Sequence, residues 1–177
     1  SSKRSALYTA TVCGHEHAAR CLITAGADVN FKDPVRLNTV LHEAILGGHT
    51  QQLVNDLVLA GSDLHTRDEY GGTPLHVAAA IGLDRVVPTL LLRGAYTDAQ
   101  DTRGATPLIY ACGSGYLSVV NTLLAAGADV TIQTNSGVSA LNNTVSGGHI
   151  DVIGALLKHG ADVNACGGDG ETPLNVA

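Results

Sequence analysis

Eight histidines are the first residues in this 177-residue chain that suggest chemistry. Zinc sites need ligands at short, regular spacings, and an H-E-x-x-H helix places two imidazoles on one face. His42-Glu43 begins such a motif, but the next histidine is His49, beyond two glycines that would end a helix. The two imidazoles would not share a helical face, so we expect no metal site.

Other catalytic arrangements are also incomplete. The cysteines form no C-x-x-C pair, so we expect reduced thiols in a reducing compartment; they are Cys13, Cys21, Cys112 and Cys166. No G-x-S-x-G sequence offers a nucleophile elbow, and no glycine cluster is followed by the Lys of a phosphate-binding loop. The sequence therefore predicts a protein that is not an enzyme and uses no cofactor.

The histidines lie within a unit that recurs along the chain. Its best copy, GGTPLHVAA, runs from Gly71 to Ala79. Three copies follow at intervals of 33 residues and two precede it at intervals of 34. One Ser or Thr marks each copy: Ser5, Thr39, Thr73, Thr106, Ser139 and Thr172. Self-similarity at this period indicates stacked repeats, whose core is a row of interfaces between neighbours.

Each copy predicts two short helices. In the best copy Thr73 can cap a helix, and the Pro after it suits the first helical position. A glycine ends this helix, and a second helix carries Val86-Val87 and Leu90-Leu91 on one face. A polar, turn-rich segment then leads to the next copy. The predicted fold is all-α, a solenoid of stacked helix pairs.

With these motifs the chain resembles ankyrin-repeat proteins. Their pattern combines T-P-L-H-x-A-A, a G-H between the helices, paired leucines and G-A-D-V-N, which here reads Gly26 to Asn30 and Gly160 to Asn164. The resemblance covers residues 5 to 177. It implies stacked helix pairs, a β-turn finger at each junction, and a concave surface of fingers and first helices that binds other proteins.

The resemblance also implies structural roles for most histidines. Two occupy the T-P-L-H position, where the imidazole bridges neighbouring loops in this family, and three occupy the G-H position. In chain order these five are His15, His42, His49, His76 and His149. The histidines without such a role are His17, His65 and His159, and nothing in the sequence brings those three together.

We expect five full repeats and part of a sixth. Residues 5–177 form the repeat domain after a flank of residues 1–4. The predicted repeats are 5–37, 38–71, 72–104, 105–137, 138–170 and the partial 171–177. Terminal repeats normally have a polar outer face, whereas this stack would stop inside a first helix. We therefore expect the chain to be a piece of a longer protein.

Departures from the pattern predict local changes. The loop from Gly26 to Thr39 is one residue longer than its counterparts and lacks D-x-x-G, so its finger should differ in shape. An extra residue between Thr50 and Leu57 would be absorbed by a bulge or a longer second helix. Pro88 predicts a bend or an altered helix start. Ala140 and Asn142 replace Pro and His, so the fifth repeat should be the least stable.

Charge and hydropathy exclude several kinds of partner. The net charge is −6, and from residue 37 onward five basic residues stand against thirteen acidic ones. Such a surface repels a phosphate backbone, so we expect no nucleic-acid binding. No apolar run approaches the roughly 20 residues of a membrane span, so we expect no membrane insertion. We expect a monomer in the cytoplasm, with the nucleus as an alternative.

A partner would meet residues that neither the turns nor the core fix. Tyr116, at a G-H position, extends this set. The candidate partner-binding residues are Arg36, Asn38, Leu46, Glu69, Tyr70, Ile81, Thr102, Arg103, Ala105, Ser114, Tyr116, Asn135, Ser136 and Val138. Tyr and Arg are common interface anchors. Tyr70, Ile81 and Arg103 lie centrally on adjoining repeats and are the leading candidates.

The sequence thus predicts a protein–protein interaction module that binds a partner protein or peptide on this surface. A rigid surface limits the entropy lost on binding. Two alternatives stay open. The array could recruit substrates for a ubiquitin ligase whose SOCS-box or F-box region lies outside this sequence, or it could be a structural or autoinhibitory arm of a larger protein. The partner cannot be inferred from a scaffold that many functions share.

Overall fold

The computed structural model describes residues 5–165 and 167, which form ten helices in five successive pairs. The first helices are α1 (Ala6–Val12), α3 (Val40–Leu46), α5 (Pro74–Ala80), α7 (Pro107–Gly113) and α9 (Ala140–Ser146). The second helices are α2 (Glu16–Thr24), α4 (Gln51–Leu59), α6 (Val86–Leu92), α8 (Leu117–Ala125) and α10 (Ile150–Lys158). The predicted all-α solenoid is confirmed. Each pair falls inside one predicted repeat, while the partial repeat at 171–177 lies outside the described residues.

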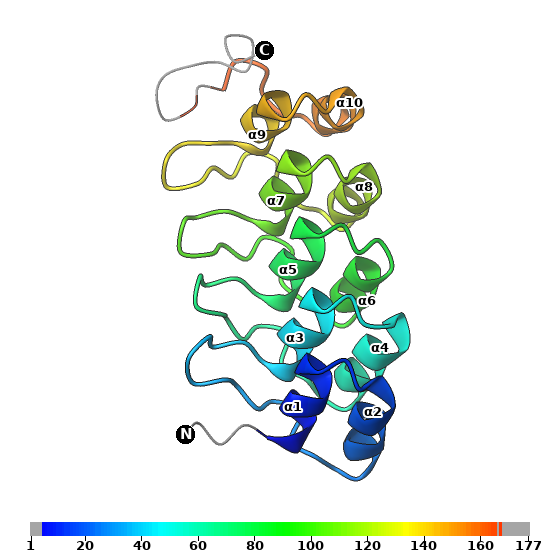
Figure 1. Cartoon of the computed structure of the whole chain (residues 1–177). Helices are drawn as coiled ribbons and strands as arrows, with labels where there is room; N and C mark the ends of the chain where they lie inside the picture. The colour runs from blue at the N-terminus through cyan, green and yellow to red at the C-terminus, as the bar shows by residue number, and fades with distance from the viewer. Residues whose placement is uncertain (1–4, 166, 168–177) are drawn as a thin grey trace.

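The helices stack in two layers (Figure 1). Each first helix packs on the first helix of the next pair, and each second helix does the same in the other layer. The loops that join the pairs project to one side as fingers. We number the fingers by the repeat that they lead into: finger 2 (32–39), finger 3 (67–73), finger 4 (100–106) and finger 5 (133–139). None of the helices in the described part of the chain is long and apolar enough to cross a membrane.

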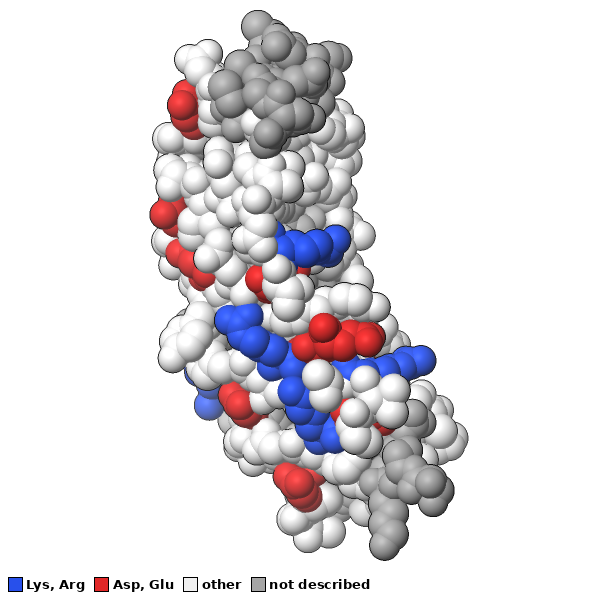
Figure 2. Space-filling model, turned by 90° about the vertical axis from the view of Figure 1, so that its left-hand side faces the viewer, with Lys and Arg blue, Asp and Glu red and all other residues white. Residues whose placement is uncertain are grey.

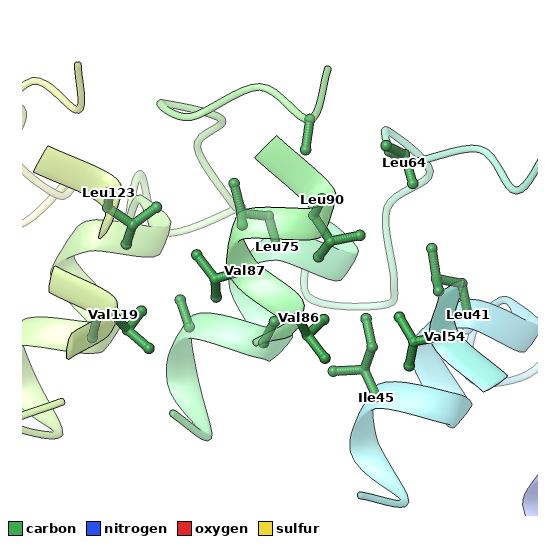
Figure 3. Packing of buried hydrophobic residues seen from close by; sticks show 14 of the residues in the cluster. Leu41, Ile45, Val54, Leu64, Leu75, Val86, Val87, Leu90, Val119 and Leu123 are labelled. Atoms are coloured by element: carbon green, nitrogen blue, oxygen red, sulfur yellow. The ribbon is translucent and has the colours of Figure 1, made fainter. Parts of the chain in front are cut away.

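The core follows the stack from one repeat to the next. The leucine of each T-P-L-H position is buried in its first helix; these leucines are Leu7, Leu41, Leu75, Leu108 and Leu141. In the second layer, Val86, Val87 and Leu90 face the first helices (Figure 3). Full burial of one such side chain contributes about 1.5–3 kcal/mol. Because each repeat covers its neighbour, the core is continuous along the array.

The predicted capping residues begin the first helices. The Tyr8 N–H donates to Ser5 Oγ at 3.1 Å, and the Ile109 N–H donates to Thr106 Oγ1 at 3.4 Å. These side-chain oxygens satisfy backbone N–H groups that have no partner inside the helix. Each short first helix therefore begins at a position that the sequence defines.

Finger 2 differs from the other fingers at its tip and matches them at its base. The Asp33 N–H donates to the Asn38 carbonyl at 2.8 Å, as the Asp68 N–H of finger 3 donates to Gly72 at 2.9 Å. The extra residue lies between these anchors, and Leu37 adopts φ +58 at the end of the turn, a left-handed conformation that favours glycine. The expected change of shape is therefore confined to the tip.

The extra residue of the second repeat lies in neither a bulge nor a longer helix, so that expectation was wrong. Helix α4 has nine residues, as α2 and α8 have. The added residue lengthens the turn after Gly48, where Thr50 becomes the N-cap of α4 and accepts from the Leu53 N–H at 3.4 Å. A turn takes up an insertion without disturbing the helix ladder.

The altered helix start predicted from Pro88 is confirmed. Helix α6 begins only at Val86 and has seven residues, two fewer than the other second helices. Pro88 is thereby the third residue of the helix, in the first turn. A backbone N–H there has no partner inside the helix, so the proline removes no helical hydrogen bond.

Candidate functional site

The tips of neighbouring fingers are joined by backbone hydrogen bonds. The Glu69 N–H donates to the Arg36 carbonyl at 3.2 Å, and the Thr102 N–H donates to Tyr70 at 3.0 Å. The next link runs from the Asn135 N–H to Arg103 at 2.8 Å. Fingers 2 to 5 therefore form one continuous edge rather than independent loops.

Aspartates brace fingers 3 and 4 from inside. Asp101 Oδ1 accepts from the N–H groups of Arg103 and Ala105 at 2.9 and 2.8 Å, and Asp68 Oδ1 accepts from Tyr70 and Gly72 in the same way. Burial alone would raise the pKa of Asp101. Hydrogen bonds from the Tyr110 hydroxyl and from the two backbone groups outweigh burial and hold that pKa below its usual value. Asp101 therefore stays ionised.

Two histidines, His42 and His76, each bond one finger to the repeat before it, finger 3 and finger 4 respectively. His42 Nε2 donates to the Gly72 carbonyl at 3.3 Å, and His76 Nε2 donates to Ala105 at 3.1 Å. In both, Nδ1 accepts from the backbone N–H of the capping threonine, Thr39 or Thr73. Burial lowers the pKa of both imidazoles, which keeps them neutral. The bridging role implied by the family resemblance is confirmed.

Two histidines at the G-H position, His49 and His149, bond instead to the preceding repeat. His49 Nε2 donates to the Thr11 carbonyl at 2.9 Å, and His149 Nε2 donates to Gly113 at 3.2 Å. One leftover histidine, His65, stacks on Tyr96 with ring centroids 3.9 Å apart. Among the described residues, no three His, Cys, Asp or Glu side chains come together as a metal site. Cys112 is buried in α7, which raises the pKa of its thiol to about 12 and makes it a poor nucleophile.

Two neighbouring hollows lie between the fingers and the first helices. The lower hollow, of about 180 Å³, is bounded mainly by Leu46, Tyr70, Val77, Ile81, Arg103 and Tyr110. The upper hollow, of about 220 Å³, is bounded mainly by Arg103, Ile109, Tyr110, Ser136, Val138 and Asn143. Arg103 and Tyr110 belong to both, so they form the ridge between the hollows. We call the fingers, the hollows and this ridge the finger face.

The ridge is held by hydrogen bonds. Arg103 Nη2 donates to Tyr110 Oη at 2.6 Å, and Tyr110 Oη donates to Asp101 Oδ2 at 2.7 Å. The Arg103 side chain is 72% exposed, whereas that of Asp101 is 1% exposed. The buried carboxylate thus positions a guanidinium that faces solvent.

Most of the sequence-predicted residues lie on the finger face. Leu46, Tyr70, Ile81 and Arg103 converge on the lower hollow, and Ser136 and Val138 border the upper one. Further exposed candidates lie at the finger tips: Arg36, Glu69, Thr102 and Asn135. Ser114 and Tyr116 are exposed too, but they lie outside the finger face in the turn between α7 and α8. Tyr70 is 64% exposed and Ile81 is 38% exposed, so both present apolar surface at the lower hollow.

Two candidates are corrected. Asn38 and Ala105 are only 8% and 5% exposed, so neither presents its side chain to a partner. Asn38 Nδ2 donates to Glu43 Oε1 at 2.9 Å, and Ala105 lies at the base of finger 4, where its N–H and carbonyl close the turn. The repeat pattern leaves both positions free, but the fold buries both side chains.

Sequence reasoning missed Tyr110 and Val77. Both occupy the position after the histidine in T-P-L-H-x-A, which the repeat leaves free. Both side chains point from a first helix into the lower hollow and are half-buried. That free position was the signal that would have found them.

Comparison with known families agrees with this geometry. A family model described as "Ankyrin repeats (3 copies)" matches residues 41–134, another described as "Ankyrin repeats (many copies)" matches 123–177, and a third described as "Ankyrin repeat" matches 2–34. The chain belongs to the ankyrin-repeat family. Ankyrin repeats are generally protein-binding modules.

Three relatives carry similar ankyrin segments. Protein PhlB of Serratia liquefaciens is 40% identical over 77 residues, 44% of this chain and 34% of PhlB. Human protein phosphatase 1 regulatory subunit 27 is 52% identical over 42 residues, 24% and 27% of the two chains. Mouse ankyrin repeat and SOCS box protein 6 is 37% identical over 76 residues, 42% of this chain and 18% of that protein. The similarity spans at most about a third of each relative.

Proposed function

We propose that the finger face binds a partner protein or peptide and performs no catalysis of its own. The observation that carries this proposal is the pair of hollows on either side of the Arg103–Tyr110 ridge. Tyr70 and Ile81 leave apolar surface exposed at the lower hollow. A partner that covered this surface would gain about 25 cal/mol for each Å² of apolar area buried.

Rigidity supports the same proposal. The finger tips are linked through backbone hydrogen bonds, and His42 and His76 fix the finger bases. A surface that is already ordered loses little conformational entropy on binding. Five of the eight histidines are at repeat positions, and four of these five bond to backbone carbonyls of neighbouring repeats. These imidazoles stabilise the stack, which favours a binding role over a catalytic role for the protein.

A second candidate rests on the similarity to mouse ankyrin repeat and SOCS box protein 6. In this version the finger face would hold a substrate, while a SOCS box elsewhere in the polypeptide would recruit a ubiquitin ligase. The full-length protein would then ubiquitinate the finger-face partner in a reconstituted reaction, whereas residues 1–177 alone would bind that partner without modifying it.

A monomeric state and a cytoplasmic or nuclear location of the protein remain predictions.

The test of the main proposal is a paired mutation. Partners are captured from a lysate with residues 1–177, identified by mass spectrometry, purified, and titrated against the wild-type chain. Replacing Tyr70→Ala together with Arg103→Ala should weaken binding at least tenfold, because each residue is an exposed anchor on the finger face. The melting temperature should stay within about 2 °C, because neither side chain contributes to the core.

Leu92→Ala with Arg93→Ala is the matched control. These residues have the same exposed character, and they line a hollow between α4 and α6 in the second-helix layer. The control pair should leave affinity unchanged. Binding that survives the finger-face pair would refute the proposal, and binding that the control pair abolishes would place the partner on the second-helix layer instead.

A further inference from the structure

Charge is distributed unevenly between the fingers and the rest of the molecule. Outside the fingers, the described residues carry four basic and ten acidic side chains. Fingers 2 to 4 carry four of each sign, and finger 5 carries none. Figure 2, which faces the fingers, shows the basic side chains gathered over the middle and lower part of this face. In an otherwise acidic protein, the fingers are therefore the region where basic groups are not outnumbered.

The basic and acidic groups of the fingers point in different directions. All four basic residues are exposed: Lys32, Arg36, Arg67 and Arg103. Among the acidic residues, Asp33 and Asp101 are buried and Asp68 is half-buried with its Oδ1 bonded to backbone N–H groups. Glu69 alone presents an exposed carboxylate among the four finger acids. A molecule approaching the face would meet mainly guanidinium and ammonium groups.

Arg103 is the best placed of these groups. It stands on the ridge between the hollows, with its guanidinium carbon 5.9 Å from the centre of the Tyr110 ring. Tyr110 and the buried Asp101 hold it at that position without covering it. Arg67 is less free, because its Nη1 donates to the carbonyls of Gly71 and Gln100. The ridge therefore offers a positioned cation between a mainly apolar lower hollow and an upper hollow that mixes Val138 with polar residues such as Thr134 and Ser136.

We propose that the finger face binds an acidic peptide segment in which one Asp or Glu lies between apolar side chains. The carboxylate pairs with Arg103, one apolar side chain enters the lower hollow beside Tyr70 and Ile81, and another enters the upper hollow beside Ile109 and Val138. Arg36 attracts further acidic residues at the finger 2 end. This inference rests on the proposed function and adds the chemistry of the partner.

A peptide fits the face better than a polyanion does. The lower hollow is lined mainly by apolar side chains and favours an apolar group, which a sugar-phosphate backbone lacks. The acidic residues outside the fingers repel a long chain of phosphates. A short acidic segment avoids that repulsion by contacting only the fingers. The same acidic surroundings steer it away from the other faces of the molecule.

The probe is a library of random 12-residue peptides displayed on phage and selected against residues 1–177. Selected peptides should be enriched in Asp or Glu flanked by apolar residues. Synthetic copies are titrated by fluorescence anisotropy, together with variants in which the acidic residue is replaced by its amide. The amide should weaken binding about tenfold, and affinity should fall between 50 and 500 mM salt.

Arg103→Gln tests the ridge, and Arg93→Gln is its matched control on α6. Arg103→Gln should weaken the acidic peptide about tenfold and leave its amide version nearly unchanged, while Arg93→Gln should affect neither. Peptides with no acidic preference that still lose affinity in Tyr70→Ala would overturn this inference and leave the proposed function standing. If the selected peptides bind the Tyr70→Ala and Arg103→Gln variants with unchanged affinity, both this inference and the proposed function are refuted. A 20-nucleotide single-stranded DNA that binds more tightly than the peptides would also overturn the inference.

Discussion

The third and fifth repeats share a backbone and differ in chemistry. In the third repeat the capping residue Thr73 pairs with His76, and in the fifth Ser139 pairs with Asn142 in the same geometry. The Asn142 Oδ1 accepts from the Ser139 N–H at 3.2 Å, just as His76 Nδ1 accepts from Thr73. An amide can thus replace an imidazole at the cap. The imidazole is longer, and its second nitrogen also reaches finger 4.

The surfaces of the two regions differ more than their backbones. Fingers 3 and 4 carry Tyr70 and Arg103, whereas finger 5 carries Asn135 and Ser136 at the corresponding tip. Helix α9 also replaces apolar residues with polar ones: Thr144 is fully buried and donates to the Ala140 carbonyl. The comparison shows that caps and finger hydrogen bonds maintain the stack while the tips vary. Three experiments test this comparison between the third and fifth repeats.

The largest expected effect comes from Gly104→Ala at the junction of fingers 4 and 5. Gly104 has φ +76, and a Cβ there would lie 2.6 Å from Asn135 Oδ1 and 2.9 Å from the Asn135 backbone nitrogen. We expect a loss of about 3 kcal/mol in the free energy of unfolding, measured by urea titration.

Gly127→Ala is the control for this substitution. Gly127 has a similar φ of +84 but no atom within 4 Å of its added Cβ. It should cost only about 1 kcal/mol, the strain of the left-handed backbone. Equal losses in the two variants would mean that contact between neighbouring fingers adds nothing to stability.

His76→Asn has the next largest expected effect. It gives the third repeat the capping partner that the fifth repeat has, an asparagine in place of a histidine. The shorter side chain can keep the cap with Thr73 but cannot reach the Ala105 carbonyl. We expect a loss of about 2 kcal/mol in the free energy of unfolding. Asn142→Ala keeps the Ser139 cap of α9 and removes the return bond from the Ser139 N–H to the Asn142 side chain, so it should cost about 1 kcal/mol. A cost for His76→Asn below that of Asn142→Ala would show that the bond to finger 4 has no net value.

The smallest expected effect is a pH dependence that belongs to His42 and His76. Burial lowers the pKa of both imidazoles in the folded chain, so the unfolded chain binds protons that the folded chain does not. Stability should therefore fall as the pH drops below about 6.5, by at most about 1.4 kcal/mol per pH unit for each histidine.

The double variant His42→Asn with His76→Asn should flatten this slope between pH 7.5 and 5.5. The pKa of Asp101 is lowered instead, so its contribution is lost only in a more acidic range. An unchanged slope in the double variant would assign the pH dependence to other groups.

Much of the fold could be predicted because the repeat presents each local signal several times. Thr73, Gly82 and the apolar pairs of α6 define one helix pair, and the spacing repeats it along the chain. Pro88 allowed the shifted start of α6 to be predicted, because a proline ring clashes with the carbonyl four residues before it unless it lies in the first turn of the helix. The position of the extra residue near Thr50 was predicted wrongly, since a turn and a helix can both absorb an insertion and only packing selects between them.

The candidate site was predicted less completely. The repeat pattern identified Tyr70, Ile81 and Arg103 because it leaves those positions free. It could not distinguish them from Asn38 and Ala105, which are equally free in sequence and buried in the fold. It also did not reveal Tyr110, whose hydroxyl lies between Arg103 and Asp101.

The sequence alone determined the architecture, because period, caps and turns act over a few residues and each repeat restates them. The roles of His42 and His76 were implied by the resemblance to ankyrin repeats. Only the tertiary structure decided which variable residues meet. Tyr70 lies in finger 3, Ile81 at the end of α5 and Arg103 in finger 4. The distances between them depend on how closely the helix pairs stack and on which finger tips bond to one another. The ridge itself is local, since Asp101 and Arg103 precede Tyr110 by only nine and seven residues. The hollows on either side of it are not local, because Leu46 and Tyr70 close one and Ser136 and Val138 close the other, and only stacking brings these segments together.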